Sequence, residues 1–264
     1  MTGADRIAAA IRARADRGGR PGRNGPALVA FLTAGYPARE RFREDLASVA
    51  SHADLVEIGV PFTDPMADGV TIQRAAHAAL LSGVTLSWIL DELARDPRPA
   101  APLLLMSYLN PLLAFGLHRL PAVAARAGVA GFVVPDLPFE ESDELRTALD
   151  AEGLALVQMV TPVTPQPRLR TLCQAASGFV YAVTRTGTTG RDVAVPPAML
   201  RYLDDVRAAS PLPVCAGFGI RNPQQVEALR NHVDGVIVGS ALVERLERGE
   251  DAATFLRSLR AAVT

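Results

Sequence analysis

Short apolar runs alternate with longer amphipathic segments along most of the chain. The apolar runs, expected to be strands, are ALVAFLTAG at Ala27, LVEIGV at Leu55, PLLLMS at Pro102, GFVVPD at Gly131, LALVQMV at Leu154, FVYAVT at Phe179, PVCAGF at Pro213 and GVIVGS at Gly235. Between them, apolar residues recur at helical spacing, and helices are expected over residues 39–50, 71–81, 117–127, 140–151, 198–208 and 223–230. Nearly continuous apolar strands are typical of a parallel sheet covered by helices. Eight strand and helix alternations therefore predict an α/β protein with a closed (β/α)8 TIM barrel, rather than an open doubly wound sheet.

An amphipathic stretch over residues 4–17 precedes the first strand and predicts an extra N-terminal helix. A linker rich in Gly, Arg and Pro follows over residues 18–26. We expect residues 1–264 to form a single barrel domain, with residues 1–26 as its N-terminal helix and linker. No apolar run is long enough to cross a bilayer, and the N-terminus lacks a signal-peptide core, so we expect a cytoplasmic protein without membrane association.

Composition narrows the possible chemistry. The formal net charge of −1 provides no global attraction to nucleic acid, which we do not expect as a partner. All 27 basic residues are arginine, and the absence of lysine excludes Schiff-base chemistry by this chain. Cys173 and Cys215 lack metal-type spacing, so they are expected to be buried apolar residues rather than a disulfide or redox pair.

Catalytic groups of such barrels lie where the strands end and on the loops that lead into the helices. Besides the carboxylates and glycines discussed below, Thr33, Tyr108, Asn110 and Asp136 occupy such positions. Glu57 interrupts the second apolar run, and Asp64 and Asp68 follow it in a proline-stiffened loop. One reading of Glu57 is structural, with its side chain paired to an arginine or directed to solvent. If it is instead buried beside a ligand pocket, burial raises its pKa and yields an acid that exchanges protons near neutral pH.

Metal chemistry is not expected. Asp64 and Asp68 are a conceivable pair of metal ligands, but hard cations take several oxygen ligands and the nearby sequence offers few others. The histidines fall in predicted helices or at their ends, away from the catalytic face, which argues against a zinc site and against histidine acid–base catalysis. They are His52, His77, His118 and His232.

Glycines follow the sixth, seventh and eighth predicted strands. Any one of Gly190, Gly219 and Gly239 is readily explained as a turn residue. Their joint occurrence in the last three loops predicts a phosphate site, because backbone N–H groups there can approach an anion. Ser240 is expected to begin the last barrel helix, to cap it and to offer its hydroxyl to the anion.

Six motifs, in order and at matching spacing, resemble the tryptophan synthase α subunit family from Ala27 onward. They are FLTAGYP, LVEIGVPFTDPMADG, VVPDLPFEES, YAVTRTGTTG, GFGI and GVIVGSALV. The resemblance implies an indole-3-glycerol phosphate lyase of tryptophan biosynthesis, which cleaves its substrate to indole and glyceraldehyde 3-phosphate by a retro-aldol reaction. It also implies that Glu57 and Asp68 are the catalytic carboxylates, with Glu57 as proton donor to indole C3 and Asp68 at the indole nitrogen.

The same resemblance assigns binding residues. Tyr181 matches a tyrosine close to the catalytic glutamate, and Thr189 matches a loop threonine that bonds the catalytic aspartate when the lid closes. The positions matched to the indole pocket are Phe31, Leu105 and Val133. Those matched to the phosphate site are Gly190, Phe218, Gly219, Gly239 and Ser240.

The family works with a pyridoxal-phosphate-bearing β subunit in an α2β2 heterotetramer, and the resemblance implies that partner here. Any pyridoxal phosphate belongs to the other chain, and we expect no cofactor in this one. Val70 follows Gly69 where the family usually has proline, which frees φ in a loop that in the family carries the catalytic aspartate and faces the β subunit. This departure leaves open a free-standing lyase that releases its indole.

Two rival functions use the same fold. A phosphosugar isomerase or epimerase needs a second acid–base residue across the pocket from Glu57, and Asp136 is the comparable candidate. A non-catalytic barrel that only activates a partner enzyme is disfavoured by the presence of both Glu57 and Asp68.

Overall fold

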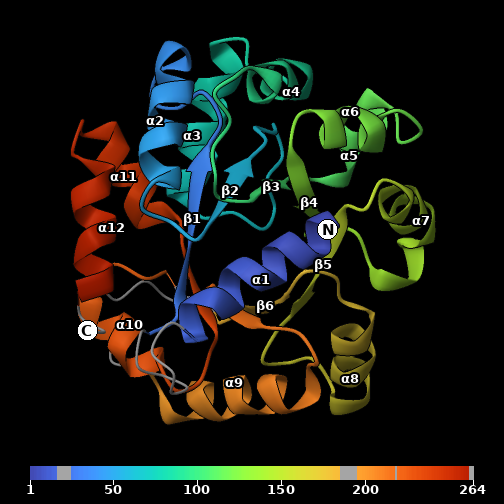
Figure 1. Ribbon diagram of the computed structural model, residues 1–264, viewed down its shortest axis with the longest axis vertical. Helices are drawn as coiled ribbons and strands as arrows, with labels where there is room; N and C mark the ends of the chain where they lie inside the picture. The colour runs from blue at the N-terminus through green and yellow to red at the C-terminus, as the bar shows by residue number, and fades with distance from the viewer. Residues whose placement is uncertain (17–24, 185–194, 218, 262–264) are drawn as a thin grey trace.

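The computed structural model describes residues 1–16, 25–184, 195–217 and 219–261, and within them eight parallel strands close into a barrel in chain order (Figure 1). The strands are β1 (Ala27–Thr33), β2 (Leu55–Gly59), β3 (Leu103–Met106), β4 (Val129–Val133), β5 (Ala155–Val160), β6 (Val180–Val183), β7 (Val214–Gly217) and β8 (Gly235–Val238). Each strand pairs with the next, and β8 pairs back onto β1. The predicted (β/α)8 barrel is confirmed.

Helices follow the strands on the outside of the barrel (Figure 1). They are α2 (Phe42–Ala50), α3 (Val70–Leu81), α4 (Leu86–Ala94), α5 (Leu109–Phe115), α6 (Leu120–Arg126), α7 (Asp143–Ala151), α8 (Gln166–Ala175), α9 (Pro197–Ala209), α10 (Pro223–Leu229), α11 (Ser240–Glu247) and α12 (Ala252–Ala261). Short 3-10 turns at Arg39–Arg41 and Phe139–Glu141 precede α2 and α7. Among the described residues, no helix is long and apolar enough to span a membrane.

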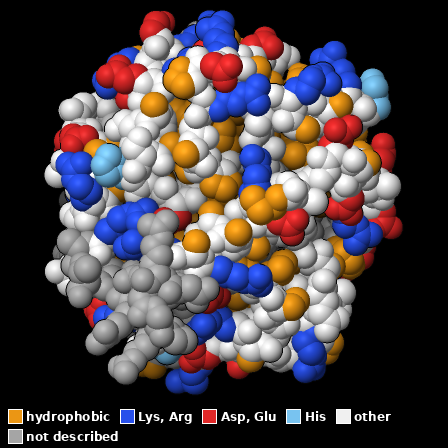
Figure 2. All heavy atoms as spheres, viewed as in Figure 1, with side chains coloured by type: hydrophobic (Ala, Val, Ile, Leu, Met, Phe, Trp, Pro, Cys, Tyr) orange, Lys and Arg blue, Asp and Glu red, His pale blue; other side chains and the backbone are white. Residues whose placement is uncertain are grey.

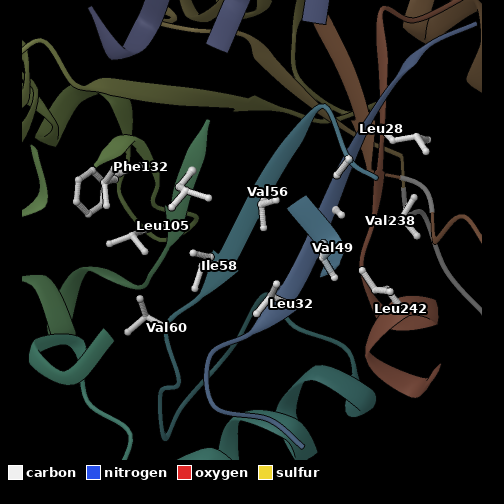
Figure 3. Packing of buried hydrophobic residues seen from close by; sticks show 14 of the residues in the cluster. Leu28, Leu32, Val49, Val56, Ile58, Val60, Leu105, Phe132, Val238 and Leu242 are labelled. Carbon is white, nitrogen blue, oxygen red and sulfur yellow. The ribbon is translucent and has the colours of Figure 1, made fainter. Parts of the chain in front are cut away.

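Strand alternation divides the core into two layers. Leu28, Val56 and Ile58 point from their strands toward the surrounding helices (Figure 3). Val29 and Leu55, their neighbours in sequence, point into the barrel instead. Because successive side chains of a strand face opposite sides, nearly every residue of these short strands is buried, which explains their continuous apolar runs.

The extra N-terminal helix is present as α1 (Gly3–Asp16). It lies across the end of the barrel where the strands begin (Figure 1), and its Ile7 and Ile11 are fully buried against the interior cluster that contains Ala27 and Leu55. Figure 2 shows this face, over which arginine and acidic side chains are interspersed. The helix therefore closes one end of the barrel, and the opposite end is left for the loops that follow the strands.

The fourth strand begins earlier than the sequence pattern indicated. Its apolar run was expected to start at Gly131, but β4 starts at Val129 and Gly131 pairs within the ladder. A Cβ atom on Gly131 would lie 2.7 Å from the carbonyl oxygen of Ala155. Gly131 is therefore required by close strand packing rather than by a turn.

Candidate active site

Glu57 lies in the middle of β2, fully buried, with Phe31 of β1 and Leu104 of β3 as its partners in the sheet register. Neither carboxyl oxygen has a hydrogen-bond partner among the described residues. Burial raises the pKa of Glu57 to about 8, and the negative charge of Asp68 contributes to the rise. A carboxyl group with this pKa is largely protonated at neutral pH and can donate a proton.

Asp68 is held by its own loop and by the loop after β3. The Tyr108 hydroxyl donates to Asp68 Oδ2 at 3.0 Å and accepts the Ala67 N–H at 2.9 Å. The Gln73 side chain donates to the Asp68 carbonyl oxygen at 2.8 Å, which ties the loop to the start of α3. Burial raises the pKa of Asp68, whereas the hydrogen bond from Tyr108 opposes that rise. That hydrogen bond favours the ionised form of Asp68, beside a Glu57 that favours the neutral form.

Tyr108 lies at the end of the third strand, as the sequence predicted, but the sequence assigned it no role in the site. Its position directly after β3 was the available signal, but the partner of its hydroxyl depends on how the β2 and β3 loops meet. Its ring also packs against Phe62, with centroids 5.2 Å apart. This ring contact restricts the Tyr108 side chain and helps to orient its hydroxyl toward the Asp68 carboxylate.

A narrow cavity reaches Asp68 from the barrel mouth. Its lining is mostly apolar and comes from the ends of β1, β2 and β3 and from α3: Phe31, Thr33, Gly59, Val60, Phe62, Asp68, Ile72, Ala76, Met106 and Tyr108. Phe31 extends over Gly59, where a Cβ atom would lie only 2.5 Å from the ring. An apolar slot with a carboxylate at its edge suits a flat aromatic ring that carries an N–H group.

The indole-pocket prediction needs one correction. Leu105 points away from the barrel interior and packs beside Ile58 and Phe132 under the outer helices (Figure 3). Its neighbour Met106 lines the cavity instead, because a shift of one residue along a strand reverses the direction of the side chain. Val133 belongs to the interior cluster, and its contact with a substrate stays a prediction.

Tyr181 of β6 also faces the barrel interior, where its ring lies 6.3 Å from that of Phe179 between centroids. Burial raises the pKa of Tyr181 well above its ordinary value, and the charges of Glu57 and Asp68 raise it further. The phenol therefore keeps its proton and is available as a hydrogen-bond donor near the two carboxylates.

The predicted phosphate residues are partly described. Gly219 follows β7 with φ of +63°, and Gly239 immediately precedes α11. The expectation that Ser240 caps this helix is wrong: Gly239 is the N-cap, no side chain caps the helix, and Ser240 is its first residue. Backbone N–H groups in a first helical turn lack partners within the helix, which suits them to an anion. Thr189, Gly190 and Phe218 lie outside the described residues.

Asp136 is the residue that an isomerase or epimerase mechanism would need opposite Glu57. Its Oδ1 accepts the backbone N–H of Leu109 at 2.9 Å, at the start of α5. Its side chain also lines a different cavity, of about 310 Å³, between the loop after β4 and helix α8. The described contacts of Asp136 are therefore with the start of α5, and none of them places it opposite Glu57.

The described residues contain no group of three or more His, Cys, Asp or Glu side chains arranged to hold a metal ion. Asp64 is exposed, whereas Asp68 is partly buried. The histidines lie in helices or next to them, as expected; His52, for example, contacts the Ser48 carbonyl oxygen through Nδ1 at 3.1 Å.

Comparison with known proteins gives one consistent family. The family model described as tryptophan synthase alpha chain matches residues 20–263. The tryptophan synthase alpha chain of Nitratidesulfovibrio vulgaris (strain DP4) is 47% identical over 235 residues, covering 88% of this chain and 91% of the relative. That of Chloroflexus aurantiacus is 44% identical over 246 residues, covering 90% of this chain and 92% of the relative.

Solved structures agree with the sequence relatives. Tryptophan synthase subunit alpha from Legionella pneumophila str. Paris matches with a TM-score of 0.86 and 30% identity, covering 100% of this chain and 98% of the other. A structure of Mycobacterium tuberculosis tryptophan synthase matches with a TM-score of 0.88 and 31% identity, covering 98% of both chains.

Proposed function

Because the chain belongs to the tryptophan synthase alpha chain family, we propose that Glu57 and Asp68 carry out its reaction, the cleavage of indole-3-glycerol phosphate to indole and glyceraldehyde 3-phosphate. The observation that carries this assignment is the fully buried Glu57 carboxyl group, whose pKa is raised to about 8 next to a second carboxylate. Burial keeps Glu57 protonated near neutral pH, whereas a hydrogen bond from Tyr108 supports the ionised form of Asp68, which suits the two carboxyl groups to act as an acid and its partner.

In the proposed mechanism, neutral Glu57 donates its proton to indole C3. The ring becomes a cation with its positive charge on the nitrogen. The Glu57 carboxylate then takes the proton of the glycerol hydroxyl next to the ring, and the carbon–carbon bond breaks. The bonding electrons return to the ring and neutralise it, an aldehyde forms, and Glu57 ends in the protonated form in which it began.

Asp68 acts on the other side of the ring. Its carboxylate accepts the indole N–H and stabilises the positive charge that develops on the nitrogen. The Tyr108 hydroxyl keeps Asp68 in place and favours its ionised form. These steps use proton transfers by side chains of this chain alone, so we expect no cofactor and no metal ion.

The phosphate group is proposed to bind where the last strands end. Gly219 and the first turn of α11, with Gly239 and Ser240, supply backbone N–H groups for it. Gly190 and Phe218 are assigned to the same site on resemblance alone, as is Thr189 to a loop that closes and bonds the catalytic aspartate. In this proposal residues 1–264 act as one barrel domain.

The partner is proposed to be a pyridoxal-phosphate-bearing β subunit that docks on the same end of the barrel and completes an α2β2 assembly. Large apolar side chains are exposed on loops and helices after β2, β3 and β5: Met66 and Val70 are each 81% exposed, Val163 is 81% exposed and Leu113 is 51% exposed. Exposed apolar side chains at one end of a barrel favour a protein interface there. The relatives named above favour this α-subunit function over a free-standing lyase.

A kinetic experiment tests the proposed roles. Replacing Glu57 by Gln keeps the shape of the side chain and removes its exchangeable proton, so turnover of indole-3-glycerol phosphate should fall at least roughly 100-fold. Glu44→Gln makes the same change at a glutamate whose side chain is 76% exposed and should leave turnover unchanged. Indole release is measured with and without the cognate β subunit. A Glu57→Gln protein that retains most of its turnover would refute the mechanism.

A further inference from the structure

Three segments that follow different strands meet at the carboxylate of Glu244, which lies on α11. Thr71, the second residue of α3, donates its hydroxyl to Glu244 Oε1 at 3.2 Å. Arg221, in the loop after β7, forms an ion pair with Glu244 and also donates to Oε1 at 3.4 Å. The Glu244 side chain is only 20% exposed. We call these three residues, Thr71, Arg221 and Glu244, the Glu244 bridge.

Each end of the bridge lies next to a segment of the proposed site. Thr71 is three residues after Asp68, in the first turn of the helix that the Asp68 loop enters. Arg221 is two residues after Gly219, and Glu244 is one helical turn beyond Ser240. The bridge therefore joins the loop of the catalytic aspartate to both described parts of the phosphate site.

The two helices also share an apolar contact beneath the bridge. Ala75 of α3 and Val243 of α11 pack together with Phe31, and all three side chains are buried. Val70, the first residue of α3, leaves φ free at the point where a proline would fix it. The position of the first turn of α3 thus depends on contacts with α11, and the Glu244 bridge supplies the polar ones nearest to Asp68.

The contacts of the Glu244 bridge keep the Glu244 carboxylate in its charged form. Burial raises the pKa of Glu244, but the hydrogen bonds and positive charge of Arg221 and the hydroxyl of Thr71 outweigh burial and leave that pKa below its ordinary value. The carboxylate is therefore ionised at neutral pH, and its hydrogen bonds are charge-assisted.

We propose that the Glu244 bridge couples phosphate binding to the placement of Asp68, with Thr71, Glu244 and Arg221 as positioning residues. The inference rests on the proposed phosphate site and catalytic aspartate. Phosphate bound at Gly219 and at the start of α11 orders the segments that carry Arg221 and Glu244. Their contact with Thr71 then holds the start of α3 and, through it, the Asp68 loop. Binding energy of the unreactive phosphate is in this way used at the reacting ring.

The test separates the substrate into two pieces. Indole-3-glycerol, which lacks the phosphate, is supplied with and without inorganic phosphate, and indole release is measured. For the unaltered chain, inorganic phosphate should accelerate cleavage of the truncated substrate. Thr71→Ser retains the hydroxyl and should retain this acceleration. Thr71→Val has a similar shape without the hydroxyl and should lose most of the acceleration by inorganic phosphate. With the complete substrate, indole-3-glycerol phosphate, its kcat should fall roughly tenfold and its KM should change by less than about twofold.

A second ion pair between the same helices provides the matched control. Arg74 of α3 pairs with Glu247 of α11, and neither residue bonds Thr71 or Glu244 in the described contacts. Glu247→Gln should leave phosphate activation and kcat within about twofold of the unaltered chain. Glu244→Gln, which keeps the shape of the bridge carboxylate but removes its charge, should behave like Thr71→Val.

The outcomes are distinct. The coupling is overturned if the unaltered chain shows no phosphate activation of the truncated substrate, or if Thr71→Val is activated as strongly as Thr71→Ser. It is also overturned if Glu247→Gln loses as much activation as Thr71→Val, because general helix packing then explains the effect. Failure of the unaltered chain to cleave indole-3-glycerol phosphate would instead refute the proposed function.

Discussion

Replacing Glu57 by Gln is expected to change how the stability of this protein depends on pH. Glu57 is fully buried, and neither of its oxygens has a hydrogen-bond partner among the described residues. Its pKa rises from 4.5 to about 8 on folding, mainly because burial disfavours the charged form. The folded state therefore holds this proton at pH values where the unfolded chain has released it. Consequently Glu57 lowers the free energy of unfolding as pH rises from about 4.5 to about 8.

The size of the effect follows from the two pKa values. One pKa unit corresponds to about 1.4 kcal/mol, so the rise from 4.5 to about 8 corresponds to about 5 kcal/mol over the whole range. Most of this range lies above pH 5, and about 4 kcal/mol of the loss should occur between pH 5 and pH 9. Glutamine cannot ionise, so the Glu57→Gln protein should not show this loss.

Urea unfolding of both proteins at pH 5 and pH 9 measures the effect. The other titrating groups are shared, and their contributions largely cancel when the two proteins are compared at each pH. The free energy of unfolding of the Glu57→Gln protein, minus that of the unaltered chain, should be about 4 kcal/mol larger at pH 9 than at pH 5. Glu44→Gln, the same change at an exposed glutamate, should show no comparable gain.

A constant difference between the two proteins, within about 1 kcal/mol from pH 5 to pH 9, would refute the reasoning, because Glu57 would then ionise as easily in the folded state as in the unfolded chain. The same pKa sets a kinetic expectation. Since the proposed mechanism begins with neutral Glu57, kcat/KM for indole-3-glycerol phosphate should decline as pH rises through about 8.

Two further substitutions test the groups around this acid. Tyr108→Phe removes the hydroxyl that joins the Ala67 N–H to Asp68 Oδ2. The value of kcat/KM for indole-3-glycerol phosphate should fall roughly 10- to 100-fold while the fold is retained. Unchanged kinetics would show that Asp68 does not need the hydrogen bond from Tyr108. Gly219→Ala places a side chain at φ of +63°, and Gly249→Ala makes the same change at φ of +68°; in each case no atom of the described residues, chain neighbours apart, lies within 4 Å of the new Cβ. Both should lose roughly 1 kcal/mol of stability in thermal unfolding, but only Gly219→Ala should raise KM for the phosphorylated substrate, and equal KM values would argue against a phosphate site there.

The order of strands and helices was determined by the sequence, because it depends on periodicities that are local. Each strand is buried on both faces and reads as a continuous apolar run, and each outer helix buries one face and reads as a 3.6-residue repeat. Glu57 stood out for the same reason, since it interrupts such a run with a carboxyl group whose charge is penalised by burial. The boundaries of the strands follow less directly from the pattern: Gly131 looks like the start of a strand, although its lack of a side chain allows packing against Ala155 inside the sheet.

Tertiary structure decided which side chains meet. Whether Leu105 or Met106 faces the cavity depends on a one-residue register that an unbroken apolar run cannot reveal. Tyr108 donates a hydrogen bond to Asp68, 40 residues away in the chain, and Thr71 donates one to Glu244, 173 residues away. Closure of the barrel brings β1 and β8 side by side, and only then do α3 and α11 become neighbours. No local pattern encodes such pairs, because the contacts form only after the packed core has fixed the distance between segments that lie far apart in the chain.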